Sequence, residues 1–371
     1  MTGEKDRPAK GRRRVVRRVL LAAVALYLLW QGGQVLLFKR YVSDLRPASS
    51  VSPLFEAEGA YHMHSRFSDG RKTADAIAKV AARAGLDFII LTDHGGPNFA
   101  SLEAQGRKDG VLVLAGSELS TNRGHLVALG FGRPDSATRF SQDAETAAGE
   151  VGALGGFTVI AHPYSKVRWS WGTAVFDGIE IIDADSVLRR HVFRALSDLP
   201  ALLLRPSYVL LKMIDPPEQT LRKWDELLRQ RYVTGFFSAD AHIFYGAIFP
   251  VFHLHVILDR ALEADFDAAR RQVFDAIRGG RFFSAVDGAA AARGFRFELR
   301  DGALHVAAPF SFAHETVIIR DGLMIHKTRD TDVTLPPPGP GVYRAEVYLR
   351  ERSPLNPAAP WIVSNPVVFG R

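Results

Sequence analysis

The 371-residue sequence contains no cysteine. Disulfide-stapled folds, thiolate zinc sites and cysteine nucleophiles are therefore excluded together. Two motifs of common enzyme classes are also missing: the G-x-x-x-x-G-K-[ST] loop that cradles nucleotide phosphates and the G-x-S-x-G elbow that presents a nucleophilic serine. ATP hydrolysis at a Walker site and covalent acyl transfer by a serine triad are accordingly not expected.

Excess charge of one sign is absent from most of the chain, although the formal net charge is +7. Residues 1–40 hold ten of the 47 Lys and Arg and two of the 40 Asp and Glu, which leaves 37 basic and 38 acidic residues after them. The basic balance therefore belongs to an amino-terminal tail and gives no support to a body that coats nucleic acid.

The length and composition are those of folded domains. Hydrophobic residues make up 47% and charged residues 23% of the chain, which is typical of globular proteins and argues against extensive disorder. At roughly 150 residues per domain, the length predicts two domains, and one large barrel-type domain is also compatible with it.

A basic tail at residues 1–14 precedes an apolar segment at residues 15–38. As a helix, this segment would extend about 36 Å, enough to cross a hydrocarbon core of roughly 30 Å. We predict a single-pass anchor in a bacterial inner membrane, with Tyr27 and Trp30 at an interface, the arginines in the cytoplasm and the following domains in the periplasm. The alternatives are a cleaved signal peptide, although no Ala-x-Ala-like site follows the apolar run, and an amphipathic surface helix.

The rest of the sequence divides into a linker at residues 39–58, an α/β part at residues 59–290 and an all-β part at residues 291–371. In the α/β part, short apolar segments typical of strands alternate with helical segments such as the alanine-rich one that starts at Thr73. This alternation predicts a parallel sheet, either closed or open.

The last part lacks any helical period and contains only short apolar segments typical of strands. Asp301-Gly302 and Asp321-Gly322 lie between such segments and are predicted to form hairpin turns. We therefore expect a small β-sandwich appended to the α/β part.

Metal-competent side chains gather at the carboxyl ends of the predicted strands. Six of the twelve histidines lie there: His62, His64, His94, His125, His162 and His242. Three acids share such positions: Asp69, Glu118 and Asp240. Ligands and catalytic groups of parallel α/β folds lie at that end of the strands. Each residue alone has a structural explanation, such as a turn or a cap, but nine together predict a metal site.

The spacing within these motifs supports chelation. H-M-H at 62–64 and D-A-H at 240–242 each place two side chains on the same face of a strand, where both can bind one ion. H-L-H at 253–255 has the same spacing, but we interpret it as strand packing because no further ligand motif accompanies it.

These motifs resemble those of the PHP (polymerase and histidinol phosphatase) superfamily. H-M-H-S-x-x-S-D-G, T-D-H-G, G-S-E-L-S, G-H-L-V-A-L-G, A-H-P-Y and S-A-D-A-H occur in the superfamily's order over roughly residues 58–290. The final W-I-V-S-N-P resembles membrane or secreted members of the carbaryl-hydrolase-like subgroup. Residues 165–215 match weakly, and T-D-H-G-G stands where T-D-H-D is more usual.

The resemblance implies a distorted seven-stranded (β/α) barrel with two or three divalent transition-metal ions at its carboxyl end. The residues that match the superfamily's ligands are His62, His64, Asp69, His94, Glu118, His125, His162, Asp240 and His242. We assign catalytic roles to three of them, Asp69, His94 and Asp240. Imidazole and carboxylate ligands without thiolates suit Mn, Zn or Fe.

We expect a metal-dependent phosphoesterase that hydrolyses a small nucleotide-like or sugar phosphate through a metal-bound hydroxide. The S-D-G motif is similar to that of phosphoesterases acting on nucleotide or oligonucleotide 3′ ends, which includes exonuclease-like activity. The alternatives are hydrolysis of an amide, carbamate or ester at the same metals, and a non-catalytic metal-binding scaffold. Because every predicted ligand precedes residue 243, a chain of residues 58–290 is expected to bind metals and to be active. No obligate protein partner is predicted.

Overall fold

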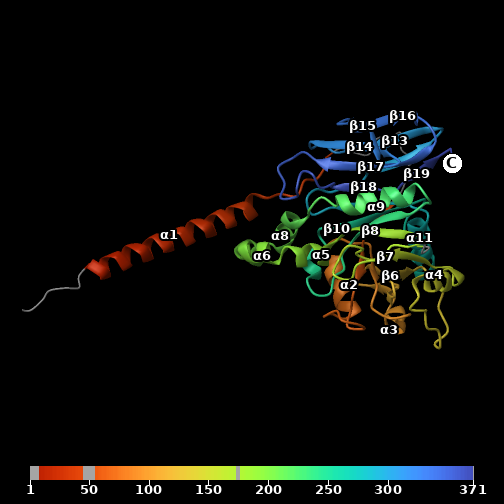
Figure 1. Cartoon of the computed structure of the whole chain (residues 1–371), viewed down its shortest axis with the longest axis horizontal. Coiled ribbons are helices and arrows are strands. Elements are labelled where there is room, and N and C mark those ends of the chain that lie inside the picture. Colours follow the sequence, from red (N-terminus) through yellow and green to blue (C-terminus); the bar gives the residue numbers. More distant parts are fainter. Residues whose placement is uncertain (1–7, 45–54, 173–175, 371) are drawn as a thin grey trace, which may run out of the picture.

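The structure is a computed structural model that describes residues 8–44, 55–172 and 176–370. It has a mixed α/β part, a mostly-sheet carboxyl-terminal part, and one long helix, α1 (Pro8–Leu37), that extends away from both (Figure 1). Residues 1–7 of the predicted tail and residues 45–54 of the predicted linker lie outside the described residues.

The elements of the α/β part follow the predicted alternation. Its strands are β1 (Phe55–Met63), β2 (Phe88–Leu91), β3 (Gly106–Lys108), β4 (Val111–Ala115), β5 (Ser117–Thr121), β6 (Gly124–Leu129), β7 (Phe157–Ile160), β8 (Gly178–Asp183), β9 (Thr234–Ser238), β10 (Phe252–Leu258) and β11 (Phe282–Val286). Its helices are α2 (Ala74–Arg83), α3 (Phe99–Glu103), α4 (Ala144–Ala153), α5 (Ala184–Arg190), α6 (Val192–Ser197), α7 (Leu199–Leu204), α8 (Pro206–Met213), α9 (Glu218–Leu228), α10 (Tyr245–Ile248) and α11 (Phe266–Arg278).

Helix α2 shows why the longer helices form where the sequence predicts them. The Thr73 hydroxyl accepts a hydrogen bond from the backbone N–H of Ala76 and caps the first turn. Ile77, Ala78 and Ala81 recur at helical spacing and are fully buried, so one face of the helix packs on the sheet. The predicted helix after Thr73 is confirmed.

Two sheets enclose the apolar core that supports the site. One contains the parallel strands β1, β2 and β4 together with the antiparallel β10 and β11, and the other has the order β5-β6-β7-β8-β9. Tyr61, Phe88 and Phe236 belong to the core cluster that both sheets share. The two sheets are joined by isolated β-bridges, one between His94 and Glu118 and one between Met63 and Ala241. Closure into a seven-stranded barrel stays a prediction.

The carboxyl-terminal strands continue the first sheet. They are β12 (Arg296–Arg300), β13 (Ala303–Ala307), β14 (His314–Arg320), β15 (Leu323–Thr328), β16 (Asp332–Leu335), β17 (Gly341–Leu349), β18 (Ile362–Ser364) and β19 (Val367–Phe369). β18 pairs with β11, and β14, β15, β17 and β19 follow, whereas β12, β13 and β16 form a separate sheet. Asp301 and Asp321 have positive φ angles of 52° and 50° at the two hairpin turns, as the sequence predicts.

Helix α1 is long and apolar enough over Arg12–Leu37 to cross a membrane, a criterion that a signal sequence near the amino terminus also meets. Its side chains from Arg12 to Trp30 are exposed, and its last turns contact the body. There the Gln31 side-chain amide donates to the Asp198 carboxylate at 2.8 Å.

The H-L-H segment at 253–255 lies in a buried ion network outside the core between the sheets. The His255 imidazole lies between the carboxylates of Glu56 and Asp287, at 2.7 and 2.6 Å. Arg296 pairs with Glu56 and Arg40 pairs with Asp287. Ligand-type atoms of Glu58, His253, His255 and Asp287 lie within 4.8 Å of one another. Since arginines balance these carboxylates, we interpret the group as a structural network.

The network predicts a pH-dependent stability. Burial disfavours the charged imidazole, but the carboxylates of Asp287 and Glu56 outweigh it and raise the pKa of His255 to about 10. The stabilisation is then complete below the ordinary pKa of about 6.5 and is lost as the pH rises toward 10. The thermal unfolding midpoint of wild type should therefore exceed that of His255→Gln by more at pH 6 than at pH 10. A difference that does not change with pH would contradict this assignment.

Candidate metal centre

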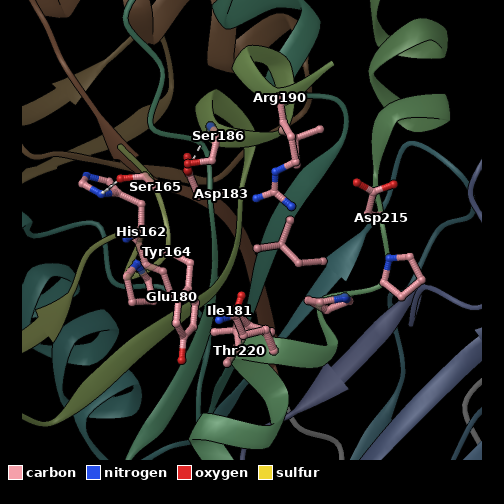
Figure 2. Close-up of a pocket in the computed structure, with 16 residues that line it drawn as sticks. His162, Tyr164, Ser165, Glu180, Ile181, Asp183, Ser186, Arg190, Asp215 and Thr220 are labelled. Atoms are coloured by element: carbon pink, nitrogen blue, oxygen red, sulfur yellow. Dashed lines mark hydrogen bonds between the residues drawn. The ribbon is translucent and has the colours of Figure 1, made fainter. Parts of the chain in front are cut away.

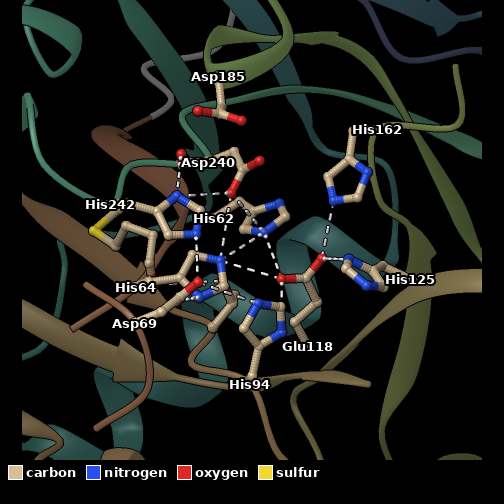
Figure 3. A network of polar contacts seen from close by, with 12 residues as sticks. His62, His64, Asp69, His94, Glu118, His125, His162, Asp185, Asp240 and His242 are labelled. Carbon is tan, nitrogen blue, oxygen red and sulfur yellow. Dashed lines mark hydrogen bonds and ion pairs between the residues drawn. The ribbon is translucent and has the colours of Figure 1, made fainter. Parts of the chain in front are cut away.

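All nine predicted ligands lie in one cluster (Figure 3). Seven of them end or follow a strand as the sequence predicts, whereas Glu118 and His125 lie at the amino-terminal ends of β5 and β6. The nine residues come from both sheets: His62 and His64 from the end of β1, Asp69 from the loop before α2, His94 after β2, Glu118 from β5, His125 from β6, His162 after β7, and Asp240 and His242 after β9. The convergence that the sequence predicts is therefore present in the structure.

The backbone is strained where three of these side chains enter the cluster. His62, His162 and Asp240 have φ angles of +65°, +28° and +37°, a region that residues with a Cβ atom seldom adopt. Such conformations persist where the surrounding structure enforces them, and they concentrate at functional sites. The strain turns these side chains toward the centre of the cluster (Figure 3).

Glu118 lies at the centre, and its two carboxylate oxygens face different sets of imidazoles. Oε2 lies 3.1 Å from Nε2 of His64 and 3.3 Å from Nδ1 of His94. Oε1 lies 2.8 Å from Nδ1 of His125 and 3.0 Å from Nε2 of His162. The Glu118 side chain is almost fully buried. This is the arrangement of a carboxylate that can bridge two cations.

The ligand atoms form overlapping groups on either side of Glu118. Each of these groups has all its ligand atoms within 4.8 Å of one another: His64, Asp69, His94 and His242; His62, His64 and Glu118; Glu118, His125 and His162; and His62, His162 and Asp240. Neighbouring groups share members, so the cluster has the capacity for more than one ion. The number and identity of the ions stay a prediction.

Unpartnered buried atoms indicate that the cluster fits cations. Nδ1 of His94, Nδ1 of His125 and Oδ1 of Asp240 are buried, and none of them makes a hydrogen bond of acceptable geometry among the described residues, although Glu118 oxygens lie 3.3 and 2.8 Å from the two nitrogens. Buried polar atoms are otherwise almost always paired, because leaving one unpaired costs free energy. Imidazole nitrogens and carboxylate oxygens that converge in this way are the ligands that a divalent transition-metal ion prefers.

The shifted pKa values within the cluster also favour a cation site. Burial would raise the pKa of Glu118, but the charge of His62 and hydrogen bonds from other imidazoles hold it well below its ordinary value. Burial would lower the pKa of His64, but hydrogen bonds with Asp240 and Glu118 raise it to about 9. The carboxylates thus stabilise positive charge at this place, as a cation site requires.

Glu180, in the interior of β8, is a functional residue that the sequence interpretation missed. Its Oε1 lies 2.6 Å from Nδ1 of His62, and its Oε2 accepts the backbone N–H of His162 at 2.7 Å. A proton held on Nδ1 leaves Nε2 of His62 free to face the cluster, which is the usual role of a carboxylate behind a metal-binding imidazole. The available signal was a lone carboxylate within the buried run G-I-E-I-I.

Asp93 and Tyr245 fix the loops that carry the ligands. The Asp93 carboxylate accepts the backbone N–H of Ser65 at 2.6 Å and the hydroxyl of Ser68 at 2.8 Å. The Tyr245 hydroxyl lies 2.6 Å from the carbonyl oxygen of His64 and 2.7 Å from that of His242. These contacts hold the segments on which Asp69, His64 and His242 lie.

A hollow of about 100 Å³ adjoins the cluster and is bordered by His162 and Glu180 on one side and by α5 on the other (Figure 2). Among the described residues, Arg190 of α5 is the basic side chain that lines this hollow. Five other basic residues that follow predicted strands in the sequence do not line it: Arg71, Lys72, Lys166, Arg168 and Lys212. Burial and the nearby Asp240 raise the pKa of Asp183, which also borders the hollow, to about 7.

Comparison with known proteins gives one sequence relative. No protein-family model matches the chain. The chain is 31% identical over 127 residues to the uncharacterized protein MJ1587 of Methanocaldococcus jannaschii, an alignment that covers 32% of this chain and 71% of that protein.

Solved structures show distant likenesses. A two-domain protein of Bacteroides vulgatus, described as containing a predicted PHP-like metal-dependent phosphoesterase, covers 90% of this chain and 99% of its own at 16% identity and a TM-score of 0.43. An amidohydrolase of Chromobacterium violaceum covers 51% of this chain and 89% of its own at 16% identity and a TM-score of 0.34. A putative metal-dependent phosphoesterase of Bifidobacterium adolescentis covers 50% of this chain and 87% of its own, at 15% identity and a TM-score of 0.34. These likenesses are too distant to assign an activity.

Proposed function

The chain belongs to the family of the uncharacterized protein MJ1587, and we propose from its own site that it is a metal-dependent phosphoesterase of the PHP type. The observation that carries the proposal is the position of Glu118, whose two oxygens face two sets of imidazoles around buried, unpartnered ligand atoms. The proposal includes closure of the two sheets into a (β/α) barrel and membership of the membrane or secreted subgroup.

The residues divide into those that hold cations and those that meet the substrate. Divalent ions bound here would supply positive charge that acidifies a water molecule and neutralises phosphoryl oxygens. Glu118 and His64 are buried at the base, whereas Asp69 and His94 are partly exposed and do not line the hollow. The substrate approaches through the hollow beside His162. Glu180 keeps His62 in the tautomer that faces the site. Arg190 adds a fixed positive charge beside the hollow for the phosphate.

The experiment that tests this function compares the hydrolysis of phosphate esters with that of a carboxylic ester and an amide. The full chain, loaded with Mn, Zn or Fe, is given an aryl phosphate monoester, a bis-aryl phosphodiester, an aryl carboxylic ester and an anilide. We expect turnover of a phosphate ester that is abolished by chelation and restored by metal. Hydrolysis of only the carboxylic ester or the anilide would favour an ester or amide hydrolase. A metal-loaded chain inactive on all four would favour the non-catalytic scaffold.

The position of Arg190 predicts a specific kinetic defect. Removing a charge-assisted contact to phosphate costs about 1.5 to 3 kcal/mol, so Arg190→Gln should raise KM for a phosphate ester by about tenfold or more. The neighbouring Arg189 pairs with Asp185 and does not line the hollow, so Arg189→Gln is the matched control and should keep KM. Equal KM values for both variants would exclude Arg190 from substrate binding.

We also propose that α1 anchors the protein in an inner membrane with the catalytic part in the periplasm. The arginines at the start of α1 favour a cytoplasmic amino end. A β-lactamase fused after Arg371 should therefore confer resistance, and it should confer less when Arg12, Arg13 and Arg14 are replaced by Glu. Resistance that is absent in the wild-type fusion, with the fusion protein intact, would reverse the orientation.

A further inference from the structure

Helices α6 and α7 expose an unusual amount of apolar surface. Their exposed large side chains are Val192, Phe193, Leu196, Leu199, Leu203 and Leu204, and Phe193 and Leu203 are 84% and 78% exposed. Single exposed apolar residues are ordinary, whereas a contiguous group marks a surface that contacts something other than water. We name residues 192–204 the apolar hairpin.

The apolar hairpin lies beside the last turns of α1 (Figure 1). The Tyr27 hydroxyl donates to the carbonyl oxygen of Ser197, and the Gln31 amide donates to the Asp198 carboxylate. Gln31 is buried against the body, whereas Trp30 is exposed. The hairpin therefore meets α1 at the point where α1 leaves the body.

This meeting point matches the edge of a bilayer. From Arg12 to Gln31, α1 rises about 28 Å, close to the roughly 30 Å of a hydrocarbon core. If Arg12 lies at one boundary, with the side chains of Arg17 and Arg18 extended back toward it, Tyr27, Trp30 and Gln31 lie at the other, where aromatic side chains are preferred. The apolar hairpin is then held at the same depth as that boundary.

The charges next to the apolar hairpin also suit a membrane surface. Arg190 and Arg194 are exposed along α5 and α6, whereas Arg189 pairs with Asp185 and Arg205 donates to the carbonyl oxygen of Phe38. Apolar side chains flanked by arginines are typical of segments that lie in the interface of membranes containing anionic lipids. A second copy of this chain would have to cover the same arginines, which would repel one another across a symmetric contact.

The apolar hairpin is continuous with the wall of the hollow. Helix α5 contributes Ser186, Val187 and Arg190 to the hollow beside His162, and it is followed after one residue by α6. A molecule anchored in the leaflet beside the hairpin would therefore lie next to the side of the hollow that carries Arg190 (Figure 2).

We propose that the apolar hairpin inserts into the bilayer surface beside α1 and that the substrate is a phosphorylated amphiphile held in the same leaflet. The substrate part of this proposal rests on the proposed phosphoesterase function. The phosphate headgroup enters the hollow toward the metal ligands while the acyl or alkyl chain stays in the leaflet, so the substrate need not leave the membrane.

The absence of cysteine permits a direct test of insertion. Spin labels are attached to Leu203→Cys and, as a matched control, to Leu323→Cys, since Leu323 is 73% exposed in β15. The full chain is placed in phosphatidylcholine vesicles containing phosphatidylglycerol. The label at 203 should be relaxed more by oxygen than by a water-soluble nickel chelate. The label at 323 should be relaxed more by the nickel chelate than by oxygen. Aqueous behaviour at 203, or spin–spin broadening from a neighbouring copy, would overturn insertion.

Activity tests the substrate class separately. Phe193→Asp with Leu203→Asp should lower hydrolysis of a long-chain alkyl phosphate in vesicles at least tenfold and leave hydrolysis of a soluble aryl phosphate unchanged. Leu323→Asp should change neither rate. Equal loss on both substrates, or a wild type that hydrolyses only the soluble one, would overturn the substrate class. A metal-loaded wild type inactive on both would instead contradict the proposed function, while the spin labels would still decide insertion.

Discussion

Replacing Glu118 with Gln is expected to remove bound metal and to lower turnover by a factor on the order of a thousand or more, because even changes behind the ligands cost 10- to 100-fold. The carboxylate is the member of the cluster that faces both sets of imidazoles, with contacts to His64 and His94 on one oxygen and to His125 and His162 on the other. An amide keeps the shape of the side chain but loses its charge and turns one acceptor into a donor. Metal content by mass spectrometry and kcat on a phosphate ester measure the two losses.

Glu180→Gln is the matched comparison for this prediction. Glu180 is as buried as Glu118 but acts through Nδ1 of His62 rather than on the cluster directly. Its amide variant should lose roughly 10- to 100-fold in metal affinity, as expected of a residue that orients a ligand. Circular dichroism should show that both variants remain folded. A Glu118→Gln protein that keeps its metals would contradict the bridging role.

The sequence predicts the metal cluster because its ligands have a topological signal. Most of the ligands follow or end a short apolar strand, and the carboxyl ends of such strands converge. His125 is the exception, since it lies at the amino-terminal end of β6. Glu180 has no such signal, since it lies within a strand where a carboxylate would ordinarily be excluded from burial. Arg190 was also missed, because it depends on the position of α5 in residues 165–215, where the sequence matches the family pattern weakly.

The fold shows the same division between local and non-local information. Thr73 caps a helix that the sequence predicts, and Asp265 caps α11 in the same way, because a cap is encoded within a few residues. The pairing of β11 with β18 joins Phe283 to Ser364, and strands so far apart leave no local pattern. The mostly-sheet carboxyl-terminal part is present as the sequence predicts, with β12, β13 and β16 in a sheet of their own, but its other five strands continue the first sheet across residue 290, which the sequence does not show.

That continuous sheet changes the expectation for a shortened chain. Asn365 accepts the backbone N–H of Gly235 in β9 at 2.8 Å and donates to the carbonyl oxygen of Phe282 at 3.1 Å. The Arg344 guanidinium pairs with Asp225 of α9 through two contacts of 2.9 and 3.0 Å. The carboxyl-terminal residues thus complete both sheets of the α/β part and neutralise a carboxylate on one of its helices.

A chain of residues 58–290, which the sequence suggests is autonomous, is therefore expected to lose cooperative folding and metal binding. Truncation leaves the edge of β11 unpaired, and unpaired strand edges are prone to association. It also removes the ion pair between Arg344 and Asp225. Asn365→Ala in the full chain is the milder comparison and should cost about 1 to 3 kcal/mol, because it leaves a buried N–H and a carbonyl group unsatisfied. Thermal unfolding followed by circular dichroism, with metal content, measures both. A soluble, metal-loaded fragment that turns over a phosphate ester would show that the sheet continuity is dispensable for the site.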